Sequence, residues 1–217
     1  MSRLRFLDSV KKMPVMALPV RSILVDGKKS ILISPGSNLT RAQLESCGSV
    51  DEIVGNNLFH CAGMAGAAAA FPKARVWGPV GAKVAKPDLP WQAELTEETW
   101  PYHEQLPMVV LKGMPKVQES VFVHRPSKTL IAADFAFNMT GPASFGSWLI
   151  LHLFGTYKRF AVSKFYAKFV EDRGAFQQSL VRLFELDFDS MAMSHGELVV
   201  GGAKEKLKAA LKERGFF

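Results

Sequence analysis

Three residues that are far apart in the chain, His60, Asp134 and His195, each stand at the end of an apolar run that has the character of a β-strand. The runs read VDEIVGNNLFH, TLIAAD and MAMSH. In a layered α/β fold, a ligand site forms where strands end. Two imidazoles and a carboxylate that meet at one such edge can share a single metal ion. The trio is therefore the leading candidate for a functional site.

Three further side chains are weaker candidates for the same site. Asn57 could add a carbonyl oxygen, Cys61 directly follows His60 and could be an extra soft ligand, and His124 ends the run VFVH ahead of Asp134. For Cys61, a small buried thiol is the competing interpretation. The sequence identifies no catalytic residue beyond these ligands, because it contains neither the GxSxG motif of serine hydrolases nor a glycine pattern that binds nucleotides.

The elements that must position the trio alternate between strands and helices. A strand at 15–25, a turn and a second strand at 30–33 predict a hairpin. A helix capped near residues 38–40 extends to about residue 47, and a short strand at 50–54 leads to His60. A small-residue helix follows His60, further strands are expected at 74–77, 108–111, 121–124, 129–133 and 190–194, and a helix at 204–212 closes the chain.

The region from about 138 to 189 differs from the rest because its apolar residues recur at helical spacing. Its second predicted helix carries basic side chains opposite an apolar face, a pattern typical of a helix that lies on a membrane surface. Packing against the core of the protein itself is the competing interpretation. The basic residues are Lys158, Arg159, Lys164 and Lys168. We expect one domain over residues 1–217 with this helical insert inside it.

Composition limits the classes of function. The 217 residues are 48% hydrophobic, which is enough for one sizeable core. The net charge of +7 is spread along the chain without a run of five basic residues, so a solvated basic face is favoured over nucleic-acid binding. Two cysteines without a pairing framework, and no secretory signal, predict a reducing, cytoplasmic location. The most apolar stretch, Phe145 to Phe154, is too short to cross a membrane.

Several of these segments together resemble a known superfamily. The stretches IVGNNLFHCAGM, FPKARVWGP, SVFVHRPSKTLIAADFAFN and SHGELVVGGAKEKLKAAL are similar to the metallo-β-lactamase fold superfamily across most of the chain. More narrowly, the His-Arg-Pro-Ser-x-Thr-Leu hairpin before the aspartate resembles a degenerate, uncharacterised branch of it. The resemblance implies a four-layer αββα sandwich, an α/β fold, with the metal site at one edge between the two sheets.

The chain departs from the superfamily where its hydrolases bind metal. Their loop reads His-x-His-x-Asp-His, and aligned on its last histidine, here His60, the earlier positions are Gly55, Asn57 and Phe59. The family's middle histidine has no counterpart either, and His124 stands where the family has an ordinary strand residue. The resemblance thus implies loss of the first metal's own ligands and at most one metal, held by His60, Asp134 and His195.

Two functions follow as alternatives. With one zinc or iron ion, the trio would support hydrolysis of an ester, thioester or phosphoester, since a bound cation activates water near neutral pH. Without metal, the histidines and the aspartate would form a vestigial hydrogen-bonded site in a protein that binds a small molecule or another protein. Peripheral membrane contact through the basic insert is a third interpretation, and no transmembrane segment is expected.

Overall fold

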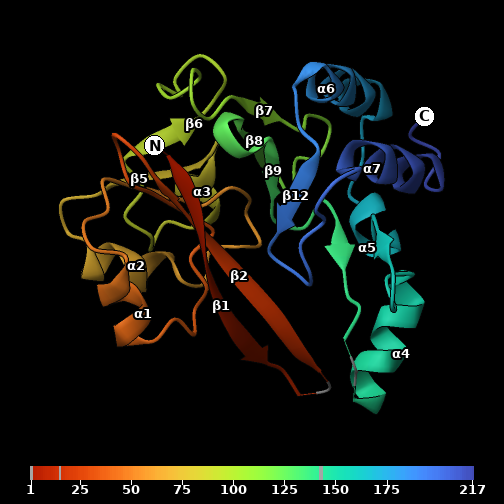
Figure 1. Cartoon of the computed structure of the whole chain (residues 1–217), viewed down its shortest axis with the longest axis horizontal. Coiled ribbons are helices and arrows are strands. Elements are labelled where there is room, and N and C mark those ends of the chain that lie inside the picture. Colours follow the sequence, from red (N-terminus) through yellow and green to blue (C-terminus); the bar gives the residue numbers. More distant parts are fainter. Residues whose placement is uncertain (1, 15, 142–143) are drawn as a thin grey trace.

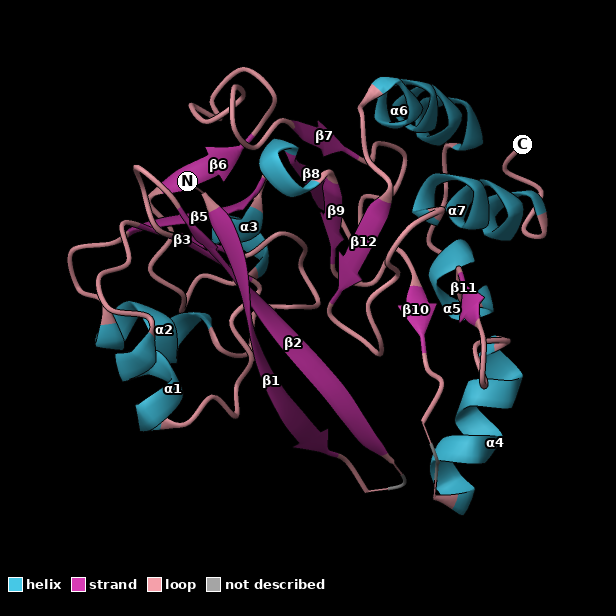
Figure 2. Cartoon of the chain, in the orientation of Figure 1, coloured by secondary structure: helices cyan, strands magenta, loops and turns pink. Residues whose placement is uncertain are grey.

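The computed structural model describes residues 2–14, 16–141 and 144–217, and its two main β-sheets lie face to face between outer helices (Figures 1 and 2). The first sheet has the strand order β1-β2-β3-β4-β5-β6 and the second has the order β12-β9-β8-β7. The first sheet comprises β1 (Arg3–Lys12), β2 (Ala17–Asp26), β3 (Ile31–Ile33), β4 (Glu52–Val54), β5 (Arg75–Pro79) and β6 (Ala93–Leu95). The second comprises β7 (Met108–Val110), β8 (Ser120–His124), β9 (Thr129–Ala132) and β12 (Ser190–Met193).

Helices cover the outer face of each sheet. On the first sheet lie α1 (Arg41–Ser46), α2 (Met64–Ala70) and α3 (Ala82–Ala85), and on the second lie α6 (Arg173–Glu185) and α7 (Ala203–Lys212). Between β9 and β12 in sequence the chain also forms β10 (Phe137–Asn138), α4 (Phe145–Phe154), β11 (Phe160–Ala161) and α5 (Lys164–Ala167). This order of layers is the expected αββα sandwich.

Three apolar cores hold the layers together, and the alternation of side chains along the strands separates them. In β8, Val121 and Val123 face the core under α6 and α7, whereas Phe122 faces the core between the sheets. In β4, Ile53 faces the core under α2 and Val54 faces the core between the sheets. Because successive side chains of a strand point to opposite faces, strands that are apolar on both faces must lie inside such a sandwich.

The early hairpin and most of the predicted strands are confirmed. β2 pairs antiparallel with β3, as the pattern at 15–25 and 30–33 predicts, although Val15 lies outside the described residues. Thr40 caps α1, since its side chain accepts from the amide of Gln43 and the Gln43 side chain accepts from the amide of Thr40. The helix at 204–212 is confirmed as α7.

Three features differ from the sequence analysis. β1 is an additional ten-residue strand that pairs along the whole of β2. The proline-rich stretch at 79–107, which the pattern leaves unassigned, contains α3 and β6. The prediction of one basic amphipathic helix around residues 160–170 is wrong, because residues 160–161 form β11 and the helix α5 has only four residues. No helix among the described residues is long and apolar enough to cross a membrane.

Candidate metal centre

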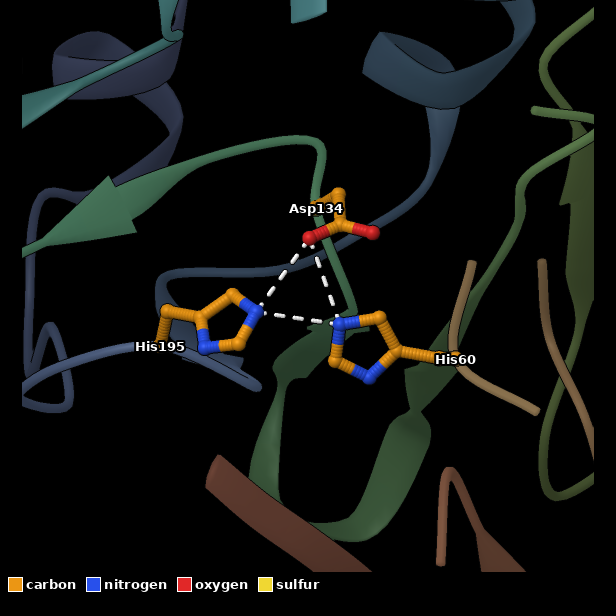
Figure 3. Close-up of side chains that lie close together, drawn as sticks. All are labelled: His60, Asp134 and His195. Atoms are coloured by element: carbon orange, nitrogen blue, oxygen red, sulfur yellow. Dashed lines mark hydrogen bonds and ion pairs between the residues drawn. The ribbon is translucent and has the colours of Figure 1, made fainter. Parts of the chain in front are cut away.

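The three residues of the trio reach one point from both sheets (Figure 3). β9 and β12 are parallel neighbours in the second sheet, so the residues after their carboxyl ends, Asp134 and His195, emerge on the same edge. His60 lies in the loop between β4 of the first sheet and α2. Parallel strands that end together, opposed by a loop from the facing sheet, bring residues distant in sequence together.

The ligand atoms of the trio form a nearly equilateral triangle. The Nε2 atoms of His60 and His195 lie 3.0 Å apart, and each lies 3.2 Å from Oδ1 of Asp134. His195 is buried, and the side chains of His60 and Asp134 are only 11% and 13% exposed. The geometry therefore points three lone-pair-bearing atoms at a common centre that is largely shielded from solvent.

His60 and Asp134 each shift the pKa of the other. Burial acts to lower the pKa of His60, but the neighbouring carboxylate of Asp134 outweighs it, so the pKa of His60 is raised. Burial acts likewise to raise the pKa of Asp134, but His60 and His195 outweigh it and hold that pKa well below its usual range. Asp134 is thus an anion at neutral pH, as a metal ligand must be.

The hydrogen bonds around the trio fix its orientation. The Nδ1 atom of His195 lies 2.7 Å from the carbonyl oxygen of Pro19 and must donate to it, so the neutral ring presents the lone pair of Nε2 to the centre. Asn57 donates to Oδ2 of Asp134 over 2.9 Å, which leaves Oδ1 to face the histidines. Metal-binding histidines and carboxylates usually have such outer partners.

Asn57 positions the site rather than supplying the ligand atom that the sequence suggests. Its carbonyl oxygen accepts from the backbone amides of Phe59 and His60, at 3.0 and 2.7 Å, and so faces away from the trio. Its amide group donates to Asp134 and, over 3.3 Å, to Glu119. This single side chain therefore holds both the loop that carries His60 and the carboxylate opposite.

Glu119 is a supporting residue that the sequence analysis missed. It is completely buried, and its carboxylate accepts from the amides of Ala133, Asp134 and Phe135. Burial, with Asp134 nearby, raises the pKa of Glu119 to about 7. The only signal in the sequence is an acidic residue at the start of the apolar run SVFVH, and a glutamate there is ordinarily solvent-exposed.

The structure does not bring Cys61 or His124 into the trio. Cys61 packs in the core under α2, donates to the carbonyl of Asn57, and burial raises its pKa to about 11. His124 is buried at the far end of β8, where its ring nitrogens lie 2.7 Å from Oγ of Ser127 and 2.9 Å from Oγ of Ser2. Both side chains are held by neighbours outside the trio.

A pocket of about 330 Å³ opens beside the trio. Its walls are mainly apolar, and they include Phe59, from the loop that carries His60, and Phe165 from α5. The ring of Phe59 is 45% exposed and makes an edge contact with Phe169. Lys11 from β1 also lines the pocket and is the one cation among its described lining residues. A small molecule that reaches His60 thus passes aromatic walls and one ammonium group.

The residues present fit one divalent cation. Tetrahedral bonds of about 2.0–2.1 Å from nitrogen and oxygen ligands to a common zinc ion place ligand atoms roughly 3.3–3.4 Å apart. The 3.0 to 3.2 Å between the ligand atoms of the trio lies within a few tenths of an ångström of that spacing. Two imidazoles and a carboxylate suit zinc and iron alike. Among the described residues, this is the group of His, Cys, Asp and Glu side chains that could hold a metal.

Comparison with known proteins gives the fold. No protein-family model and no curated protein matches the chain. A metallo-β-lactamase from Pontibacter korlensis is 14% identical, with a TM-score of 0.68 over 98% of this chain and 95% of its own. A metallo-β-lactamase from Erythrobacter litoralis is 13% identical, with a TM-score of 0.64 over 100% of this chain and 89% of its own.

A larger protein shares the same fold. The rubredoxin oxygen:oxidoreductase from Desulfovibrio gigas is 11% identical, with a TM-score of 0.69 over 98% of this chain. This chain spans only 60% of that oxidoreductase. The expected fold is confirmed: the chain has the metallo-β-lactamase fold, and it carries a candidate metal site of three residues.

Proposed function

We propose that this chain, which combines a metallo-β-lactamase fold with a reduced set of ligands, is a metal-dependent hydrolase of a small ester, thioester or phosphoester. His60, Asp134 and His195 would hold a single zinc or iron ion. The observation that carries the proposal is the triangle of ligand atoms 3.0 to 3.2 Å apart at the joint of the two sheets. When bound there, such an ion polarises a carbonyl or phosphoryl oxygen and lowers the pKa of water to about 7.

A single ion is proposed because the ligands for a second are missing. The loop before His60 has Gly55, Asn57 and Phe59 where the superfamily's hydrolases have two histidines and an aspartate. Asn57 turns its carbonyl oxygen to the backbone, and Phe59 turns its ring to the pocket. We therefore propose that the chain belongs to a degenerate branch of the superfamily and holds at most one metal ion.

The chain's own residues supply orientation and selectivity. Asp134 remains ionised and is oriented by Asn57, while the carbonyl of Pro19 fixes the tautomer of His195. The apolar walls of the pocket exclude water from the reacting bond. Lys11 attracts a negative group, so we expect the preferred substrate to carry a carboxylate or phosphate near the scissile bond.

A metal-free binding site is the second candidate, and one observation favours it. His195 already donates to Pro19, so a hydrogen on Nε2 of His60 can be shared with His195 and Asp134, and the trio can be satisfied without an ion. In that case the pocket would bind a small molecule without turning it over. The two candidates differ in whether the purified protein retains metal.

Elemental analysis by mass spectrometry tests the proposal. Protein purified without chelator or affinity metal should contain about one zinc or iron ion per chain, and the Asp134→Asn variant should contain none, because its only anionic ligand is lost. Asp88→Asn, at an exposed position without ion pairs among the described residues, is the matched control and should retain the metal. Circular dichroism confirms that both variants are folded.

Metal content and turnover together separate the alternatives. Metal in the wild type and in Asp88→Asn, with hydrolysis of anionic esters or thioesters that Asp134→Asn lacks, supports the hydrolase. A wild type that stays free of metal after incubation with zinc and iron excludes it and leaves the binding protein. Metal that persists in Asp134→Asn shows that the ion is held elsewhere.

A further inference from the structure

α4 exposes large apolar side chains at one end of the molecule. Ser147 and Leu151 face the protein and are buried, but Phe145 is 79% exposed, Leu153 63%, Leu149 44% and Trp148 39%. Phe145 and Trp148 stack on each other, with ring centroids 5.7 Å apart. Soluble proteins rarely expose several large apolar residues side by side unless another surface covers them.

The tip of the β1–β2 hairpin lies at the same end as α4 (Figure 1). Val10 and Ala17 of the hairpin and Ser147 and Leu151 of α4 line one cavity of about 390 Å³, so the two elements face each other across it. Val10 is itself 51% exposed. The hairpin therefore faces the inner side of α4, and the outer side, with Phe145, Trp148, Leu149 and Leu153, remains exposed.

The segment that carries α4 is basic. Residues 138–170 contain no Asp or Glu and include Lys158, Arg159, Lys164 and Lys168. Residues 9–20 also lack acidic residues and contain two adjacent lysines, Lys11 and Lys12. Arg159 pairs with Glu213, but the five lysines form no ion pair in the described part of the chain. Lys158 lies over the ring of Tyr157, which contacts His152 next to Trp148, and Lys164 lies beside Gly155 at the end of α4. The exposed apolar face of α4 is thus bordered by positive charge, whereas Asp8 and Glu197 lie on the cavity side of the helix.

We propose that the outer face of α4 forms a docking surface for a bilayer that contains anionic phospholipid. We call it the α4 surface and define it by these residues: Phe145, Trp148, Leu149, Leu153, Lys158 and Lys164. Aromatic and aliphatic side chains would enter the interface, and the lysines would contact the headgroups. A second copy of the chain is disfavoured as the occupant, because it would oppose like charges. The proposal is independent of whether the trio binds metal.

Co-sedimentation with vesicles tests the proposal on the full-length chain. The wild type should sediment with vesicles of phosphatidylcholine and phosphatidylglycerol, and at least about tenfold less with phosphatidylcholine alone, because each lysine near an anionic surface contributes appreciably. High salt should weaken the binding. Trp148→Glu with Leu149→Glu should abolish it, and Lys158→Glu with Lys164→Glu should reduce it at least about tenfold.

Two matched controls lie on and beside α3, which packs on the first sheet. Val80 is 47% exposed and Val84 87%, so Val80→Glu with Val84→Glu adds the same two charges at exposed apolar positions, and Lys83→Glu with Lys86→Glu reverses two exposed lysines. Both should bind vesicles like the wild type. Since all these residues are exposed, the variants should fold, and circular dichroism checks that they do.

Three results would overturn the proposal. The first is a wild type that sediments with neither kind of vesicle. The second is binding to anionic vesicles that Trp148→Glu with Leu149→Glu leaves unchanged. The third is a concentration-dependent dimer, measured by light scattering without vesicles, that the same double variant abolishes. That result would assign the α4 surface to self-association.

Discussion

Asn57 governs the site at the scale of a single residue. It is the side chain that joins Asp134 to the loop carrying His60. We predict that Asn57→Ala weakens zinc affinity about 10- to 100-fold, as loss of an outer partner typically does. Competition with a chromogenic chelator measures the affinity. Gln178→Ala, which removes an exposed amide on α6, should leave it unchanged, and equal affinity in Asn57→Ala would contradict the assigned role.

His124 gives a residue-scale prediction for pH. Burial lowers its pKa in the folded protein, whereas in the unfolded chain it protonates near about 6.5. At pH values between these two pKa values, the unfolded state therefore binds more protons than the folded state. The contribution of His124 to folding stability is complete above about pH 6.5 and is lost as the pH falls toward the pKa of the folded protein. The melting temperature of the wild type should thus fall more steeply between pH 7 and pH 5 than that of His124→Gln.

Differential scanning fluorimetry measures this difference. At pH 7 the His124→Gln variant should be less stable by about 1–3 kcal/mol, because the hydrogen bonds to Ser2 and Ser127 are disrupted in a buried place. His103→Gln, in an exposed loop, is the control and should melt like the wild type at every pH. Parallel pH profiles for wild type and His124→Gln would show that His124 does not sense pH.

For single residues, the sequence predicts where a side chain lies better than it predicts what that side chain does. The trio was predictable because each member follows an apolar strand, and strand ends meet at an edge in an α/β fold. The role of Asn57 was not predictable, because its side-chain amide offers both a donor and an acceptor. Only the neighbouring groups in the fold determine which of the two faces the site. Glu119 could not be recognised, because nothing local marks a glutamate that three backbone amides hold in the interior.

At the scale of the element, α2 depends on two glycines in opposite ways. A Cβ on Gly63, just before the helix, would collide with the carbonyl oxygens of Pro35 and Gly36, whereas one on Gly66 would meet nothing. We predict that Gly63→Ala destabilises the protein by about 1–3 kcal/mol through overpacking, and that Gly66→Ala stabilises it by about 0.5–1 kcal/mol.

Urea unfolding of the two alanine variants checks this pair. Because Gly63 lies three residues after His60, Gly63→Ala should also weaken zinc binding, and Gly66→Ala should not. Equal stability of the two variants would mean that the loop at Pro35 moves to accommodate a methyl group at residue 63.

Element predictions failed where local pattern and burial disagree. β1 has a half-buried and strongly charged pattern with Arg3, Arg5, Asp8, Lys11 and Lys12, so it resembles a loop until its pairing with β2 is known. Its position at the edge of the sheet explains the charges. The apolar residues around 160–170 recur at helical spacing. In the structure, however, they belong to a strand, a turn and one short helix.

For the whole molecule, metal binding should link the two sheets. His60 comes from the side of the first sheet, and Asp134 and His195 come from the second. Zinc at about 100 times its dissociation constant should add about 2.7 kcal/mol, or roughly 5–10 °C in melting temperature for a protein of this size. Excess chelator should reverse the increase, and His195→Ala should show none. An equal zinc-induced increase in His195→Ala would place the ion elsewhere.

The separation of the trio from the three apolar cores has an evolutionary consequence. Strand alternation and the cores define the fold, while the trio stands on connections beyond the strand ends. Substitutions of the trio therefore leave the apolar cores intact, so selection can act on chemistry and fold separately. A protein with this fold can gain or lose single ligands while its cores persist, which makes a site of three ligands an accessible state between catalyst and scaffold.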